Sequence, residues 1–83
     1  MLVTLKTLAD KTRLRLLAIL ARGEFTVQEL TSILQMGQSR VSRHLRILLD
    51  AGLIVLKKQG TWSYYRLDLS GGLFGRLWPI IEP

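Results

Sequence analysis

The sequence predicts a mainly α-helical domain with one small antiparallel β-hairpin, and three observations predict it. Residues 2–50 contain four apolar patterns at helical spacing, separated by capping and breaking residues. Residues 53–67 hold two runs rich in β-branched and aromatic residues around a glycine, which is typical of a hairpin. A last apolar helical pattern follows at about residues 70–80. The predicted order is α-α-α-α-β-β-α, and 83 residues are enough for a single domain, 1–83, with one core.

The first two helices are predicted over about residues 2–9 and from residue 11 onward. In the first helix, leucines recur at helical spacing at positions 2, 5 and 8. Asp10 can cap the second helix, and Gly23 can end it. We expect the second helix to bury one apolar face, formed by Leu14, Leu17, Ala18 and Ala21.

The third and fourth helices are separated by the tight break Gln35-Met36-Gly37. Thr26 and Glu29 stand at capping-box spacing, which predicts a helix over residues 27–34. Its expected buried stripe is Leu30, Ile33 and Leu34. The fourth helix is predicted over Gln38–Asp50. Its expected inner face is Val41, Leu45, Leu48 and Leu49.

Residues 53–58 and 62–67 are the predicted strands of the hairpin, and Gln59-Gly60-Thr61 is its predicted turn. The second strand is rich in aromatic residues: Trp62, Tyr64 and Tyr65. Stacking on the bases of single strands is one interpretation of these rings. Aromatic residues in a hairpin more often pack on a core, and we expect these three to do so.

The last helix can be capped by Ser70, and Pro79 should kink or end it because proline lacks an amide hydrogen. Its apolar residues are Leu73, Phe74, Leu77 and Trp78. A small-molecule pocket is one interpretation of this group. We favour a dimer interface, because the first helix offers matching leucines.

This order of elements is that of a winged helix-turn-helix, with the helix-turn-helix at about residues 27–50 and the wing at about 53–67. Packing of the third helix across the fourth would fix which side of the fourth helix faces outward. That outer face carries Gln38, Ser39, Arg40, Ser42, Arg43 and Arg46. Such side chains match base edges and phosphates of double-stranded DNA. Lys57 and Lys58, expected at the hairpin tip, are predicted to reach the neighbouring phosphates or minor groove.

The charge distribution supports a polyanionic partner. The formal net charge is +6. Residues 40–66 hold six of the basic side chains, and Asp50 is the only acid among them. A merely solvated helix mixes both signs, whereas this outer face has no acid before Asp50. Two alternatives remain at this point: a helical hairpin with a solvated polar face, and a winged helix that binds only protein.

Other classes of protein find little support. The sequence lacks a nucleophile–base pattern, paired carboxylates and a phosphate-cradling loop, so we predict no enzyme, no cofactor and no catalytic residue. It has no cysteine, and one histidine cannot form a metal site. We expect a partly buried hydrogen-bonding role for that histidine, His44. Lys6 and Asp10 interrupt any signal peptide, and the longest apolar run, Leu16–Ala21, is too short for a bilayer, so a soluble cytoplasmic protein is expected.

Four segments together resemble the ArsR/SmtB family of bacterial repressors. Residues 5–17, LKTLADKTRLRLL, are similar to the family's opening, and residues 39–48, SRVSRHLRIL, to its recognition helix. Residues 51–54, AGLI, and 60–67, GTWSYYRL, resemble the following turn and the wing. The resemblance implies a homodimer joined through the first and last helices, about 2–9 and 70–80, which binds a palindromic operator and represses transcription.

The resemblance also implies roles for individual residues. Recognition-helix roles fall on Ser39, Arg40, Ser42, Arg43 and Arg46, and wing roles on Lys57 and Lys58. The dimer interface would consist of Leu2, Leu5, Leu73, Phe74, Leu77 and Trp78.

The departures from the family pattern concern the sensor and the turn. Metal-sensing members carry cysteines in the third helix or histidine and carboxylate pairs in the last, and this sequence has neither. We therefore predict no metal site, and the effector is unknown. Gln35 stands where the family prefers glycine, and left-handed geometry there would cost about 1–2 kcal/mol. Gly37 replaces a capping serine but is an acceptable N-cap. An alternative is the DNA-binding domain of a longer regulator that carries an effector or methyltransferase domain.

Overall fold

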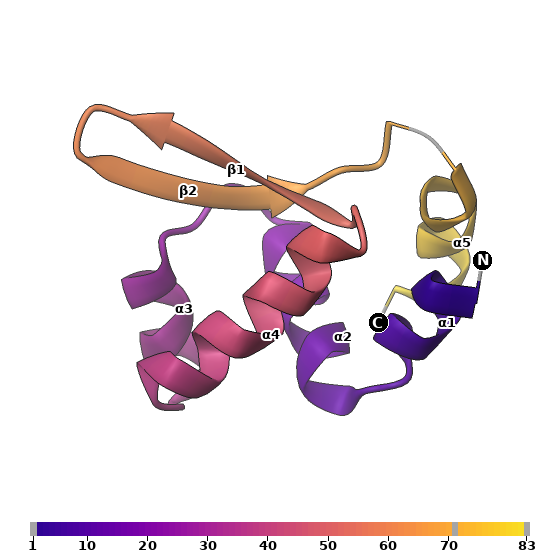
Figure 1. The fold of residues 1–83 in the computed structure, drawn as a ribbon, viewed down its shortest axis with the longest axis horizontal. Coiled ribbons are helices and arrows are strands. Elements are labelled where there is room, and N and C mark those ends of the chain that lie inside the picture. Colours follow the sequence, from indigo (N-terminus) through magenta and orange to yellow (C-terminus); the bar gives the residue numbers. More distant parts are fainter. Residues whose placement is uncertain (1, 71, 83) are drawn as a thin grey trace.

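The computed structural model describes residues 2–70 and 72–82, with the exception of the Leu2 side chain. The elements run in the order α1 (Leu2–Leu8), α2 (Lys11–Leu20), α3 (Val27–Leu34), α4 (Gln38–Asp50), β1 (Ile54–Gln59), β2 (Trp62–Leu67) and α5 (Gly72–Ile81). This is the predicted α-α-α-α-β-β-α order, and the fold prediction is confirmed. Figure 1 shows the hairpin extended along one side of the molecule beside α3 and α4, with α1 and α5 together at the opposite end. Among the described residues, no helix combines the length and the apolar character that a bilayer span requires.

α2 is the central helix, and its buried face differs from the prediction. Asp10 caps it as expected, accepting a hydrogen bond from the Arg13 backbone N–H at 3.0 Å. The buried residues are Leu16, Leu17 and Leu20, whereas Ala21 is exposed. The predicted stripe was therefore wrong in part. The reason is that α2 contacts α1, α4 and β2, so its buried surface is wider than the single stripe of a surface helix.

The helix-turn-helix is positioned by the predicted cap and turn. Thr26 Oγ1 accepts from the Glu29 N–H at 3.2 Å, and Glu29 Oε1 accepts from the Thr26 N–H at 2.8 Å, which completes the capping box of α3. Gln35 adopts the left-handed conformation with φ 54°, and Gly37 caps α4 without a side-chain hydrogen bond. Ile33 was predicted to be buried but is 49% exposed. Leu30 and Leu34 are the buried residues of α3 and belong to the core cluster, whereas Ile33 lies outside that cluster.

One apolar cluster joins all five helices and the start of β1. Its most completely buried side chains are Leu16, Leu17, Leu20, Leu30, Val41, Leu45, Leu48, Leu53 and Ile54. Each buried leucine contributes about 1.5–3 kcal/mol relative to an exposed one. The inner face of α4 is therefore held firmly, and the direction of its outer face follows from that packing.

The wing is a two-stranded antiparallel sheet in which Gln59 pairs with Trp62 across the turn Gly60-Thr61. Gly60 has φ 60°, a conformation that suits glycine. Phe25 and Tyr65 exchange backbone hydrogen bonds of 3.1 and 2.8 Å, which tie the strand to the segment before α3.

The aromatic side chains of β2 do not all pack on the core. Tyr65 packs against the core cluster, as predicted. Trp62 is 56% exposed, so its predicted core position is wrong. Side chains alternate along a strand, so when Tyr65 points to the core, Trp62 and Tyr64 belong to the opposite face.

α5 corrects two further expectations. The helix continues past Pro79 to Ile81, and the Glu82 N–H still donates to the Trp78 carbonyl at 2.9 Å, so Pro79 does not end it. Phe74 and Trp78 are only 4% and 3% exposed and contact each other with ring centroids 5.7 Å apart. These two side chains, predicted at the dimer interface, fill the core of the single chain instead. The predicted Ser70 cap depends on residue 71, which lies outside the described residues.

Candidate nucleic-acid interface

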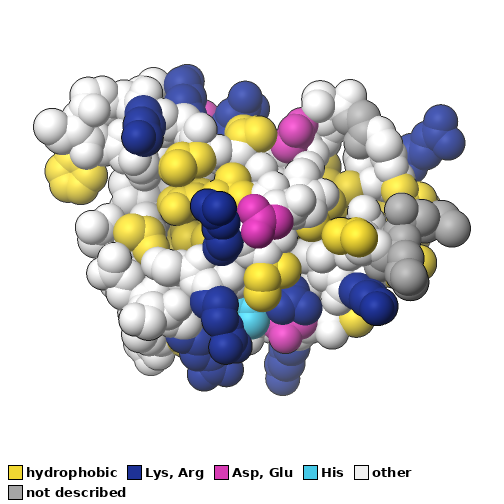
Figure 2. Space-filling model, in the orientation of Figure 1, with side chains coloured by type: hydrophobic (Ala, Val, Ile, Leu, Met, Phe, Trp, Pro, Cys, Tyr) yellow, Lys and Arg dark blue, Asp and Glu magenta, His cyan; other side chains and the backbone are white. Residues whose placement is uncertain are grey.

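The outer face of α4 presents every polar residue that the sequence assigned to it. Gln38, Ser39, Arg40, Ser42, Arg43 and Arg46 are all exposed. The inner face, Val41, His44, Leu45 and Leu48, is buried. Figure 2 shows basic side chains gathered on this side of the molecule, around the histidine. The sequence pattern therefore produced a two-faced helix whose polar side is available to a partner.

The arginines on this face have different local partners. Arg46 Nε lies 3.4 Å from Asp50 Oδ1 in an ion pair with both side chains largely exposed. Exposed pairs of this kind contribute only about 0.2–1 kcal/mol, so Arg46 can exchange Asp50 for a phosphate at little cost. Among the described residues, Arg40 and Arg43 have no ion-pair partner. Their positive charges are therefore available to an anionic partner that contacts this face.

The first turn of α4 adds backbone donors to the same surface. Gly37, the N-cap, has no side chain that could bond to these N–H groups. Such a helix start favours an anion, because the free N–H groups and the helix dipole both attract negative charge. A phosphate beside Gln38 and Ser39 would satisfy these donors.

A partly buried network of hydrogen bonds around Arg13 lies beneath this face, and the sequence did not predict it. Arg13 Nε donates to the Thr7 carbonyl at 2.7 Å, and its Nη2 to the Lys6 carbonyl at 3.4 Å. Its Nη1 lies 3.5 Å from Nδ1 of His44 and 3.8 Å from Oδ2 of Asp10. Arg13 thus joins the end of α1 to the inner side of α4. The sequence predicted a partly buried, hydrogen-bonding His44. The hydrogen-bonding role is confirmed, with Arg13, far away in the chain, as the partner, but the side chain is more fully buried than predicted.

Burial lowers the pKa of His44 below its usual value of 6.5. The guanidinium groups of Arg13, Arg43 and Arg40 lower it further, and the Asp10 carboxylate opposes this shift. The neutral imidazole is therefore favoured, and it can accept a hydrogen bond at Nδ1 from Arg13. The pKa of Asp10 is also lowered, chiefly by the hydrogen bond from the Arg13 backbone.

The wing places Lys57 and Lys58 on β1, both exposed. They pair with Tyr64 and Ser63, so they lie slightly below the turn, and their predicted position at the tip is wrong. Glu24 lies 3.8 Å from Arg66 and adds a contact between the wing and the body.

The α1–α5 end exposes an apolar surface. A groove of about 330 Å³ is lined by Leu5, Leu8, Ala9, Leu14, Leu77 and Ile81. Leu5 is exposed, while Leu73 and Leu77 are half-buried. The sequence missed Val3 and Ile80, which are 63% and 78% exposed. Leu2 was also predicted at the interface, but its side chain is outside the part of the chain that the structure describes. We define the candidate dimer surface as Val3, Leu5, Leu73, Leu77 and Ile80.

Comparison with known proteins gives a consistent result. Residues 10–55 match the model of the bacterial regulatory protein, arsR family. The chain is 50% identical over 64 residues to the arsenical resistance operon repressor of Bacillus subtilis, covering 76% of this chain and 61% of the relative. It is 46% identical over 66 residues to the arsenic resistance transcriptional regulator ArsR1 of Pseudomonas putida, covering 78% of this chain and 52% of the relative. The chain therefore spans only about half to three fifths of these curated relatives.

A solved structure supports the same fold. The solution structure of a homodimeric winged helix-turn-helix DNA-binding domain from Mycobacterium bovis, described as a possible ArsR-family transcriptional regulator, superimposes with a TM-score of 0.79. It is 33% identical, and the match covers 92% of this chain and 68% of that one.

Proposed function

The chain belongs to the arsR family of bacterial regulatory proteins, and from that premise we propose that it is a sequence-specific transcriptional repressor which binds a palindromic operator in double-stranded DNA as a homodimer. The observation that carries the proposal is the outer face of α4. Three arginines, two serines and a glutamine are exposed on it, while the opposite face is buried. This is the arrangement by which a recognition helix enters the major groove.

The residues divide into base readers and phosphate binders. Arg40 and Arg43 are assigned to base edges, because arginine can bind guanine through two parallel hydrogen bonds. Gln38 can pair with adenine, and Ser39 and Ser42 suit a base or a phosphate. Arg46, at the end of the face, is assigned to the backbone together with the wing residues Lys57 and Lys58.

The dimer would place its two recognition helices in successive major grooves. Half-sites about 34–36 Å apart fit one turn of duplex. We assign the dimer contact to the candidate dimer surface, which is apolar and lies at the α1–α5 end, away from the wing (Figure 1).

The proposal assigns no catalytic activity and no metal sensor. Soft-metal sensing needs thiolate or imidazole ligands, and the sequence has no cysteine and one histidine. We place the repressor in the cytoplasm, where bacterial DNA is found. The single domain 1–83 is proposed as the DNA-binding unit, whether or not further domains accompany it.

The test is a binding experiment with operators selected from random duplex pools. The double variant Arg40→Ala, Arg43→Ala should lose preference for the selected sequence, with each lost base contact reducing discrimination by about 1–3 kcal/mol. Arg15→Ala, Arg22→Ala is the matched control, since it removes the same charge from exposed positions outside α4. Equal specificity in both variants would refute the recognition-helix assignment. No salt-dependent duplex binding by the wild type would favour a winged helix that binds only protein.

A further inference from the structure

A hollow of about 330 Å³ lies between the first turn of α3 and strand β2. Its lining consists of Thr26, Gln28, Glu29, Trp62 and Tyr64. The proposed DNA contacts use none of these side chains. Trp62 also contributes little to the core, because it is more than half exposed. An exposed aromatic surface beside a hollow with a few polar groups is typical of a small-molecule site.

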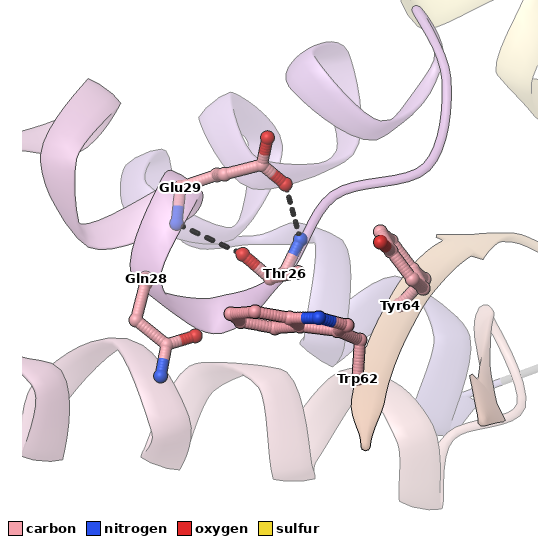
Figure 3. A pocket seen from close by; sticks show the side chains of 5 residues that line it. All are labelled: Thr26, Gln28, Glu29, Trp62 and Tyr64. Atoms are coloured by element: carbon pink, nitrogen blue, oxygen red, sulfur yellow. Dashed lines mark hydrogen bonds between the residues drawn. The ribbon is translucent and has the colours of Figure 1, made fainter. Parts of the chain in front are cut away.

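The chemistry of the lining indicates a cation. Figure 3 shows the Trp62 ring along one side of Thr26, the Glu29 side chain on the other side, and Tyr64 standing next to them. The capping box uses Oε1 of Glu29, which accepts from Thr26. The second carboxylate oxygen takes no part in the capping box and keeps its capacity to accept. The faces of indole and phenol rings attract cations, and aromatic sites of this kind recognise quaternary ammonium groups.

The distribution of charge around this site also favours a cation. Of the described residues that line it, Glu29 alone is charged. The chain as a whole carries a net charge of +6, and its basic side chains on α4 are assigned to DNA. An anionic ligand would be drawn to the basic face, whereas the hollow offers a cation one carboxylate and two aromatic rings.

The hollow is joined directly to the wing. Tyr64 pairs with Lys57, and Trp62 pairs with Gln59, next to Lys58. An occupant that moves the two aromatic residues away from α3 also moves the wing lysines. We propose that this hollow binds an organic cation with apolar surface, and that its occupancy lowers DNA affinity by displacing the wing. The second part rests on the proposed function. By linkage, DNA must weaken binding of the cation by the same factor.

The site is tested by calorimetric titration with benzyltrimethylammonium as the probe and benzyl alcohol as its neutral control. The wild type should bind the cation at millimolar concentration or below and bind the alcohol at least about tenfold more weakly. Glu29→Gln removes the charge but keeps the capping box, because glutamine also serves at this position. It should weaken binding about fivefold, and Trp62→Leu about tenfold or more.

The matched control is Glu82→Gln, the same change at an exposed carboxylate outside the hollow. It should bind the probe like the wild type. Equal binding by wild type and Glu29→Gln, equal binding of the two probes, or no binding by the wild type would each overturn the proposal. Thermal unfolding of each variant separates lost binding from lost fold.

A DNA titration tests the regulatory part. Saturating probe should weaken operator binding by the wild type at least about threefold and leave Trp62→Leu unaffected. If the protein binds no DNA at all, the proposed function fails, while calorimetry still decides the fate of the cation site. If Trp62→Leu weakens DNA binding without any probe effect on the wild type, Trp62 contacts DNA and the regulatory part of the proposal is wrong.

Discussion

The two ends of this molecule differ in how fully one chain covers their apolar side chains. In the helix-turn-helix, Leu30, Val41 and Leu45 are almost fully buried, and what remains exposed on α4 is polar. Among the described residues of this end, Ile33 of α3 is the one large apolar side chain that stays about half exposed. At the α1–α5 end, Val3, Leu5 and Ile80 stay exposed. The first end has the surface expected for a polar partner such as DNA. The second has the surface expected for another protein chain.

This difference suggests that one end reads DNA, that the other joins two chains, and that the first function depends on the second. Reading an operator with two half-sites requires two copies of α4 at a fixed separation. That separation would be set at the α1–α5 end. Arg13 is the physical connection, since it bonds to carbonyls of α1 and reaches His44 on α4.

The largest effect is expected from damage to the buried side of α4. Leu45→Ala should lower the free energy of unfolding by about 2–5 kcal/mol, because it removes buried contacts and leaves a cavity. Urea denaturation measures this loss. Ile33→Ala is the control, because its side chain on α3 is half exposed, and it should cost less than about 1 kcal/mol. Similar losses in both variants would contradict the packing described for the helix-turn-helix.

Loss of the connection between the two ends should come next. Arg13→Met keeps the aliphatic stem but removes hydrogen bonds from a charged group to the α1 carbonyls, so it should cost about 1.5–3 kcal/mol of stability. Arg15→Met on the same helix is the control, because Arg15 is exposed. A structural role alone predicts only this loss. A role in coupling also predicts that Arg13→Met relaxes the preference for half-site spacing, measured with operators of altered spacer length.

A smaller and more selective effect is expected from a charge at the α1–α5 end. Ile80→Asp should weaken the dimer at least about tenfold, or about 1.4 kcal/mol, because a carboxylate would be desolvated in the apolar contact. Sedimentation at several concentrations measures it. Ile33→Asp is the same change at another exposed helical isoleucine and should leave the dimer intact. Dissociation by both variants, or by neither, would place the contact elsewhere.

The same comparison explains how much could be predicted from sequence. The helix-turn-helix was predictable because its signals are local: a capping box at Thr26, a break at Gln35 and helical spacing on α4. At the α1–α5 end, Phe74 and Trp78 were apolar residues at correct helical positions, but spacing cannot tell a core from an interface. Whether they are buried depends on which helices pack against each other in the tertiary structure, and helical spacing carries no information on that. For the same reason the Arg13–His44 contact, between residues 31 positions apart, had no signal in the sequence.

The smallest effect concerns that contact and pH. The pKa of His44 is lowered in the folded protein, mainly by burial, so the unfolded chain binds more protons near the usual value of 6.5. Stability should therefore be constant above about pH 7.5 and fall as the pH drops through 6.5, by at most about 1.4 kcal/mol per unit. The pKa of Asp10 is lowered from 3.8, and the stability it contributes is lost only in more acidic solution, as the pH falls below that value. Urea denaturation between about pH 5.5 and 8 thus isolates His44. In His44→Gln, which keeps a polar group beside Arg13, the slope should disappear; an unchanged slope would assign it to another group.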